Sequence, residues 1–126
     1  MGSGTEIGRV RGLGAAKSGV GHWWQQRVTA VGNLILLLWF IGSLVWLPAL
    51  DYTTVVAWLR QPVAAVPMLL LILSVFWHFR LGVQVFIEDY LHKEGTKLLA
   101  LLALNFYALA GATAAAFAVL KIALGA

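Results

Sequence analysis

The sequence lacks cysteine and has few charged residues. Of its 126 residues, 61% are hydrophobic and 11% are charged, whereas about 25% of the residues in a soluble domain carry a charge. The absence of cysteine excludes disulfides, thiolate chemistry, and zinc or iron–sulfur sites built on cysteine. The shortage of charge excludes an ordinary soluble domain and indicates a protein that resides in a lipid bilayer.

The net charge of +4 does not indicate a nucleic-acid-binding protein. Four of the basic residues precede the first long apolar run: Arg9, Arg11, Lys17 and Arg27. Lysine and arginine clustered beside an apolar segment are typical of membrane topology. We therefore expect no nucleic acid partner.

Three apolar runs predict an all-α integral membrane protein with three transmembrane helices, over about 28–50, 62–87 and 97–123. Each run has the roughly 20 apolar residues that a helix needs to cross a bilayer. Residues 1–27 are expected to form a short amphipathic or irregular N-terminal arm, with Trp23, Trp24 and Arg27 among the lipid headgroups. Residues 1–126 are thus expected to form a single membrane-anchor domain.

The distribution of lysine and arginine predicts the orientation of these spans. The arm contains four such residues, and Lys93 and Lys97 flank the second connection. The first connection contains only Arg60, and the C-terminal end only Lys121. Because basic residues favour the cytoplasmic side, the N-terminus is predicted inside and the C-terminus outside.

His78 lies within the second predicted span. A histidine at this depth is a functional hypothesis by default, as a haem ligand, a hydrogen-bonding group between helices or part of a proton path. Gly82, four residues on, shares its helix face and would let a porphyrin approach the backbone. Ser74 or a backbone carbonyl is the expected partner of the other ring nitrogen. His22 and His92 are expected at or outside the membrane surface, so two-histidine ligation would need another protein chain.

Two arginines also have alternative interpretations. Arg27, at the predicted inner surface, is either an ordinary anchoring residue or a cation for haem propionates or a quinone oxygen. Arg80 lies about 200° around the helix from His78. It must therefore extend towards the membrane surface or pair with a carboxylate or a propionate.

Asp89 and Tyr90 stand where the second span leaves the membrane, about 16 Å along the helix from His78. They form either a solvated helix end or a polar site in which the phenol donates to a quinone carbonyl beside a carboxylate. Quinone reduction consumes two protons as well as two electrons, so a site close to water is chemically suitable.

At these residues the chain resembles the membrane anchor of succinate dehydrogenase, which is also called succinate–ubiquinone oxidoreductase or respiratory complex II. The pattern is a histidine, a glycine four residues on, and an Asp-Tyr pair eleven and twelve residues on: His78, Gly82, Asp89 and Tyr90. A second match consists of His22 followed by Arg27, Val28, Thr29 and Ala30. The three-span layout agrees, and the resemblance extends from about residue 19 to the C-terminus.

The resemblance implies roles for four residues. His78 would be the axial ligand of haem b iron, paired with a histidine of the sister anchor, a cytochrome b556-type protein. Arg27 would lie near the haem propionates. Tyr90 would bind ubiquinone, with Asp89 in support.

The resemblance further implies that FAD and the iron–sulfur clusters belong to the flavoprotein and iron–sulfur partner subunits. This chain would be a non-dehydrogenase subunit, with no catalytic residues of its own, that passes electrons from succinate oxidation to ubiquinone. A multi-pass location in a bacterial inner (cytoplasmic) membrane is expected, rather than the mitochondrial inner membrane. The alternatives are the anchor of a fumarate reductase, or a small membrane transport or assembly protein that uses His78 and Arg80.

Overall fold

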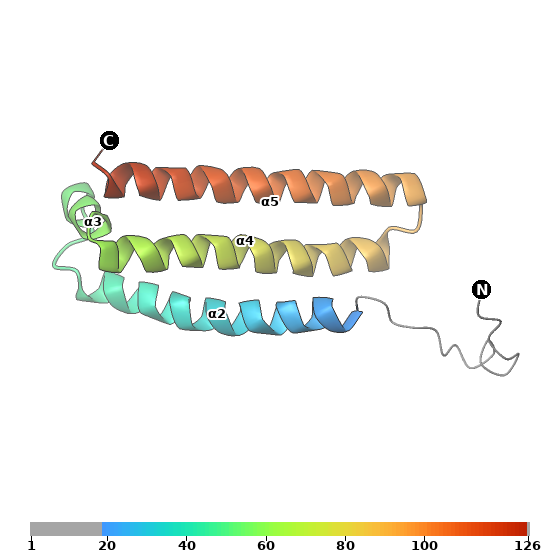
Figure 1. Cartoon of the computed structure of the whole chain (residues 1–126), viewed down its shortest axis with the longest axis horizontal. Helices are drawn as coiled ribbons and strands as arrows, with labels where there is room; N and C mark the ends of the chain where they lie inside the picture. Colours follow the sequence, from blue (N-terminus) through green and yellow to red (C-terminus); the bar gives the residue numbers. More distant parts are fainter. Residues whose placement is uncertain (1–18, 126) are drawn as a thin grey trace, which may run out of the picture.

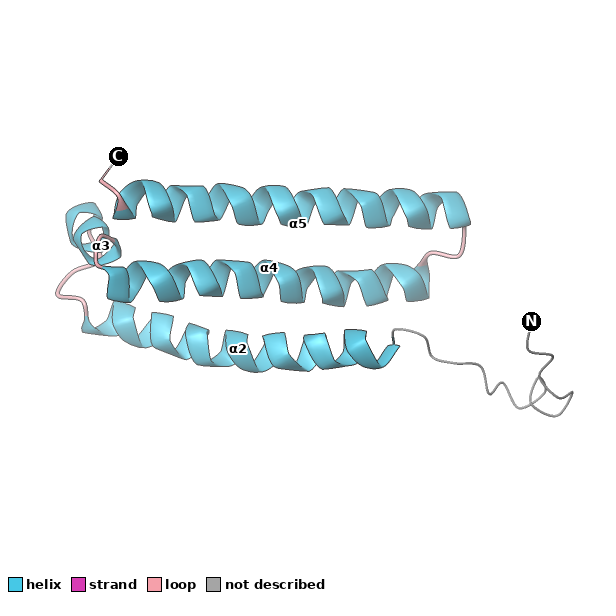
Figure 2. Cartoon of the chain, in the orientation of Figure 1, coloured by secondary structure: helices cyan, strands magenta, loops and turns pink. Residues whose placement is uncertain are grey.

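The computed structural model describes residues 19–125, which form three long helices and one short helix (Figure 1). Their bounds are α2 (Gly19–Trp46), α3 (Tyr52–Leu59), α4 (Pro62–Tyr90) and α5 (Glu94–Ala123). Within residues 19–125, everything outside these helices is loop or turn (Figure 2). Residues 1–18 of the predicted arm lie outside the described residues.

The predicted fold class is confirmed. Helices α2, α4 and α5 contain 28, 29 and 30 residues, and each is long and apolar enough to cross a membrane. At 1.5 Å per residue each measures about 42–45 Å, which exceeds a hydrocarbon core of about 30 Å. The ends of the helices therefore reach the polar interface on both sides.

The first helix differs from the predicted span over 28–50. It begins at Gly19, so residues 19–27 of the predicted amphipathic or irregular arm are helical and continuous with the first span. This segment contains straight-chain residues such as Gln25 and Gln26, which favour a helix once it has formed. The helix ends at Trp46 because Pro48 lacks a backbone N–H and disfavours helical geometry in the residue before it.

Helix α4 lies in the middle, with α2 against one side and α5 against the other (Figure 1). Within residues 19–125, α2 and α5 make no contact with each other. Gly111 permits the approach of α5, since a Cβ there would lie 2.4 Å from the Phe76 ring. A small residue at a helix contact is typical of membrane bundles.

The outward faces of the helices are apolar and uncovered. Leu38, Leu73 and Leu109 are 63%, 54% and 67% exposed, whereas Leu81, on the central helix, is 1% exposed. Exposed leucines over the length of a membrane span face lipid or other subunits. The chain therefore has little interior of its own.

The two ends of the bundle differ. We call the end that contains Gly19, Tyr90 and Glu94 the polar end, and the end that contains Trp46, Pro62 and Ala123 the aromatic end.

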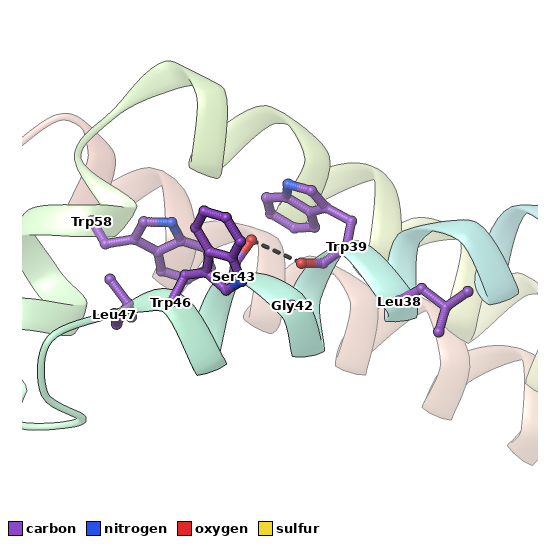
Figure 3. Close-up of a pocket in the computed structure, with 7 residues that line it drawn as sticks. All are labelled: Leu38, Trp39, Gly42, Ser43, Trp46, Leu47 and Trp58. Atoms are coloured by element: carbon purple, nitrogen blue, oxygen red, sulfur yellow. Dashed lines mark hydrogen bonds between the residues drawn. The ribbon is translucent and has the colours of Figure 1, made fainter.

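At the aromatic end, the Trp58 ring of α3 stacks on Trp39 of α2 with centroids 5.8 Å apart. These rings, with Trp46, Ser43 and Leu47, line a hollow of about 460 Å³ (Figure 3). Tryptophan is enriched at the membrane interface, where such rings anchor a helix end.

Candidate functional site

A hollow of about 900 Å³ lies between α2 and α4 near the polar end. It brings together three residues for which the sequence predicts a role: Arg27 from α2, and His78 and Gly82 from α4. The other lining residues are Gly19, His22, Trp23, Gln26, Ala30, Gln84, Val85 and Glu88. We call this space the α2–α4 hollow.

His78 is half-buried, and its Nδ1 lies 3.0 Å from the Thr29 hydroxyl oxygen of α2. The expectation that Ser74 or a backbone carbonyl would meet this nitrogen was wrong. The side chain of Ser74 instead lies near Gly32, where an added Cβ would stand 3.5 Å from the Ser74 hydroxyl oxygen. Thr29 belongs to the segment that follows Arg27 in the sequence pattern, but only the packing of α2 on α4 pairs it with His78.

Arg27 and Gly82 shape the hollow in different ways. The Arg27 guanidinium lies 5.6 Å from the Trp23 ring centroid, and the side chain is exposed. This cation–π contact holds the positive charge of Arg27 against the surface of α2. At Gly82 an added Cβ would lie 3.5 Å from Gln26 Nε2, an ordinary contact, so packing within the chain does not require glycine there.

His22, which the sequence predicted at or outside the membrane surface, lines the same hollow as His78. Its Nε2 is buried, and it has no hydrogen-bond partner in the described part of the chain. His22 precedes Thr29 by seven residues, or about 10 Å of helix, and so lies towards the mouth. Gln84 donates to Glu88 there, at 2.8 Å. The mouth is thus polar.

Tyr90 and Asp89 do not line the hollow. Tyr90 is the last residue of α4, is 68% exposed, and stacks on Phe86 with ring centroids 4.5 Å apart. It lies about 120° around the helix from His78. Asp89 beside it is exposed. The structure therefore separates the His78 region from the Asp89–Tyr90 region.

Within this chain, Arg80 makes contacts that the sequence did not predict. Its Nε donates to the Asn105 side-chain oxygen of α5, and its guanidinium lies 5.4 Å from the Trp77 ring centroid. Both groups border a second, mainly apolar hollow of about 780 Å³. The arginine is thus held by a neutral amide and an aromatic face. Asn105 was not predicted from the sequence because the contact joins residues from two different helices.

Comparison with known proteins identifies the family. Residues 1–112 match the succinate dehydrogenase/fumarate reductase transmembrane subunits. The succinate dehydrogenase hydrophobic membrane anchor subunit of Rickettsia bellii is 33% identical over 87 residues, which cover 69% of this chain and 70% of the relative. The succinate dehydrogenase membrane anchor subunit of Reclinomonas americana is 30% identical over 96 residues, which cover 74% and 80%.

No solved structure gives a significant match. The family match and the relatives agree with the three membrane-spanning helices. The chain therefore belongs to the family of succinate dehydrogenase/fumarate reductase transmembrane subunits, as a multi-pass membrane anchor subunit of the succinate dehydrogenase type.

Proposed function

We propose that this chain holds one side of a b-type haem and part of a ubiquinone site in a succinate–ubiquinone oxidoreductase. The α2–α4 hollow carries the proposal, because it surrounds one space of about 900 Å³ with His78, Arg27 and the Gly82 backbone. A haem supplies its own ring nitrogens and needs only axial ligands from protein. One histidine in a hollow suits such a group, whereas no cluster of three His, Cys, Asp or Glu for a bare metal ion occurs in residues 19–125.

Three residues of the α2–α4 hollow have separate roles in this proposal. His78 ligates the iron from α4, and Gly82 leaves the backbone open to a flat ring on the same helix face. Arg27 binds propionate carboxylates, for which a guanidinium is suited by its paired N–H donors. When bound, the haem takes up and returns single electrons.

The second axial ligand comes from another protein chain. His22 lies about 10 Å along α2 from the level of His78, and His92 is exposed in the loop between α4 and α5. We therefore expect neither of them to share an iron with His78. The natural source is the sister anchor of the cytochrome b556 type. The FAD and the iron–sulfur clusters lie in the flavoprotein and iron–sulfur subunits that this anchor holds at the membrane.

Tyr90 and Asp89 contribute to the quinone site at the polar end. Tyr90 ends α4 with an exposed ring, so its hydroxyl is free to donate to a carbonyl of a quinone headgroup at the interface. Asp89, exposed beside it, shapes the site or passes protons from water. Because Tyr90 lies on another face of α4 than His78, the quinone approaches separately from the haem.

The polar end faces the cytoplasm of a bacterium in this proposal. Arg27, Lys93 and Lys97 lie at that end, whereas Arg60 and Lys121 lie at the aromatic end. The excess of basic residues favours a cytoplasmic N-terminus and a periplasmic C-terminus. Electrons from the soluble subunits then arrive at the end that contains Tyr90.

Family membership decides against a transport or assembly protein that uses His78 and Arg80. The family also includes fumarate reductase anchors, so the reverse reaction is the second candidate. The similarity to two succinate dehydrogenase anchors favours succinate oxidation.

A visible absorption spectrum of the purified complex tests the haem assignment. The wild-type complex should show the Soret and α bands of a low-spin b-type haem, and His78→Ala should remove or alter them. Tryptic mass spectrometry of the same preparations shows whether the partner subunits still co-purify. An unchanged spectrum in an intact His78→Ala complex contradicts the assignment.

A further inference from the structure

We infer that Thr29 is a positioning residue that fixes the tautomer and the orientation of His78, so that the Nε2 lone pair faces the haem iron. The inference rests on the proposed role of His78 as a ligand. It assigns a function to a side chain of α2, the neighbouring helix, rather than to the helix that carries the ligand.

Three short contacts meet at the Thr29 hydroxyl. The oxygen lies 2.8 Å from the Gln25 carbonyl oxygen and 3.2 Å from the Gln26 carbonyl oxygen. It lies 3.0 Å from His78 Nδ1. A hydroxyl has a single hydrogen to donate, together with lone pairs that accept. The two carbonyl oxygens can only accept a hydrogen bond. The Thr29 hydroxyl therefore donates its hydrogen to them.

Because the Thr29 hydroxyl has a single hydrogen, the contact determines which ring nitrogen of His78 is protonated. With the hydroxyl donating to the carbonyls of its own helix, the contact to Nδ1 is a hydrogen bond only if Nδ1–H donates to Thr29. The opposite arrangement would leave the hydroxyl oxygen 2.8 Å from a carbonyl oxygen with no hydrogen between them. A neutral imidazole protonated at Nδ1 has its lone pair on Nε2, the form that ligates a metal.

The packing of α2 on α4 holds Thr29 in register with His78. Three neighbouring contacts follow one another along the interface: Gln26 beside Gly82, Thr29 beside His78, and Gly32 beside Ser74. Each step advances three residues on α2 and retreats four on α4, as expected for antiparallel helices in close contact. An added Cβ at Gly82 or Gly32 would lie 3.5 Å from its neighbour, so the contacts on either side of Thr29 are of ordinary van der Waals length.

The hydrogen bond also polarises the ligand. A hydroxyl that already donates to a carbonyl is a better acceptor, because linked hydrogen bonds strengthen one another. Electron density drawn from Nδ1–H towards Thr29 makes Nε2 more basic and stabilises ferric iron. Loss of the bond should therefore raise the reduction potential of the haem and weaken its attachment.

The test compares three variants of the complete complex. Thr29→Val keeps the shape of the side chain and removes the hydroxyl, whereas Thr29→Ser restores a hydroxyl. Ser74→Ala is the matched control, because it removes a hydroxyl at the same interface that makes no hydrogen bond to His78 within residues 19–125. The measurements are the haem midpoint potential by redox titration and the transfer of haem to apomyoglobin.

For Thr29→Val we expect a raised midpoint potential and haem affinity lower by about 10- to 100-fold, as is typical when the partner of a ligating histidine is lost. Thr29→Ser should restore both, and Ser74→Ala should match the wild type. A Thr29→Val complex with wild-type potential and haem affinity overturns the inference, as does the absence of rescue by serine. Retention of haem by His78→Ala would instead overturn the proposed function.

Discussion

The two ends of the bundle share the same three long helices, yet titratable side chains line the α2–α4 hollow and not the hollow at the aromatic end. The α2–α4 hollow at the polar end collects His22, Arg27 and His78. The hollow at the aromatic end is walled by Trp39, Trp46 and Trp58. Length and hydropathy alone do not distinguish these ends. The distribution of titratable side chains between the two hollows distinguishes the two ends.

The hydroxyl groups show the same contrast. At the polar end, Thr29 connects its own helix to His78 of α4. At the aromatic end, Ser43 donates to the Trp39 carbonyl at 2.8 Å, within α2 (Figure 3). Unlike Thr29, Ser43 makes no hydrogen bond to another helix within residues 19–125, so it has no side chain of a neighbouring helix to position. The aromatic end is therefore suited to anchoring in the interface.

Reporter fusions test which end of the bundle faces the cytoplasm and which faces the periplasm. A reporter fused after Ala126 should respond as periplasmic, because three spans place it opposite a cytoplasmic N-terminus. A reporter inserted at His92, in the loop of the polar end, should respond as cytoplasmic and serves as the internal control. A cytoplasmic response at Ala126 would reverse the orientation or remove a span.

Gly111→Ala should destabilise the complex by about 1–3 kcal/mol, the usual range for overpacking. The added methyl would clash with the Phe76 ring, so either the ring or α5 itself must shift. Gly42→Ala at the aromatic end is the matched control, since it meets nothing within 4 Å in the described chain and improves helix propensity. Thermal unfolding of both variants checks this; equal melting temperatures would contradict the close α4–α5 contact.

Tyr90→Phe should lower succinate-to-quinone turnover by about threefold to tenfold, which corresponds to one neutral hydrogen bond of about 0.5–1.5 kcal/mol. Succinate oxidation with an artificial acceptor should not change, because that reaction occurs in the soluble subunits. Tyr52→Phe is the control at the aromatic end, where the exposed tyrosine has no assigned role. Equal quinone kinetics for both variants would make Tyr90 an interfacial anchor only.

The smallest effect concerns Arg80 and Asn105, which lie between the two ends. A double-mutant cycle with Arg80→Ala and Asn105→Ala should give a coupling energy of about 0.5–1.5 kcal/mol. The side-chain amide of Asn105 is neutral, so the contact lacks the attraction between the two charges of an ion pair. Stability of the detergent-solubilised complex is the measurement, and strictly additive effects would show that the contact contributes nothing.

The sequence predicted the features that depend on local pattern. Apolar runs identified the three spans, and the spacing of His78 and Gly82 predicted that they share a helix face. The partner of His78 and the acceptor of Arg80 were not predicted, because Thr29 and Asn105 belong to other helices. Such contacts depend on the register between helices, which hydropathy does not encode. Pro48 accounts for the end of α2 at Trp46, although the predicted span extended to about residue 50.

The arrangement of α2, α4 and α5 in a row, with the outer two out of contact, makes the chain one helix thick. A single layer of helices has two outer faces and no interior that can enclose a cofactor. A cofactor that it binds can be sealed from lipid only at a seam with another protein chain. If this chain binds haem as proposed, retention of the haem shows that two subunits have assembled, and a copy without its partner lacks both the cofactor and the protein that covers it. Quality control of the complex could thus act on the same exposed surface that assembly removes.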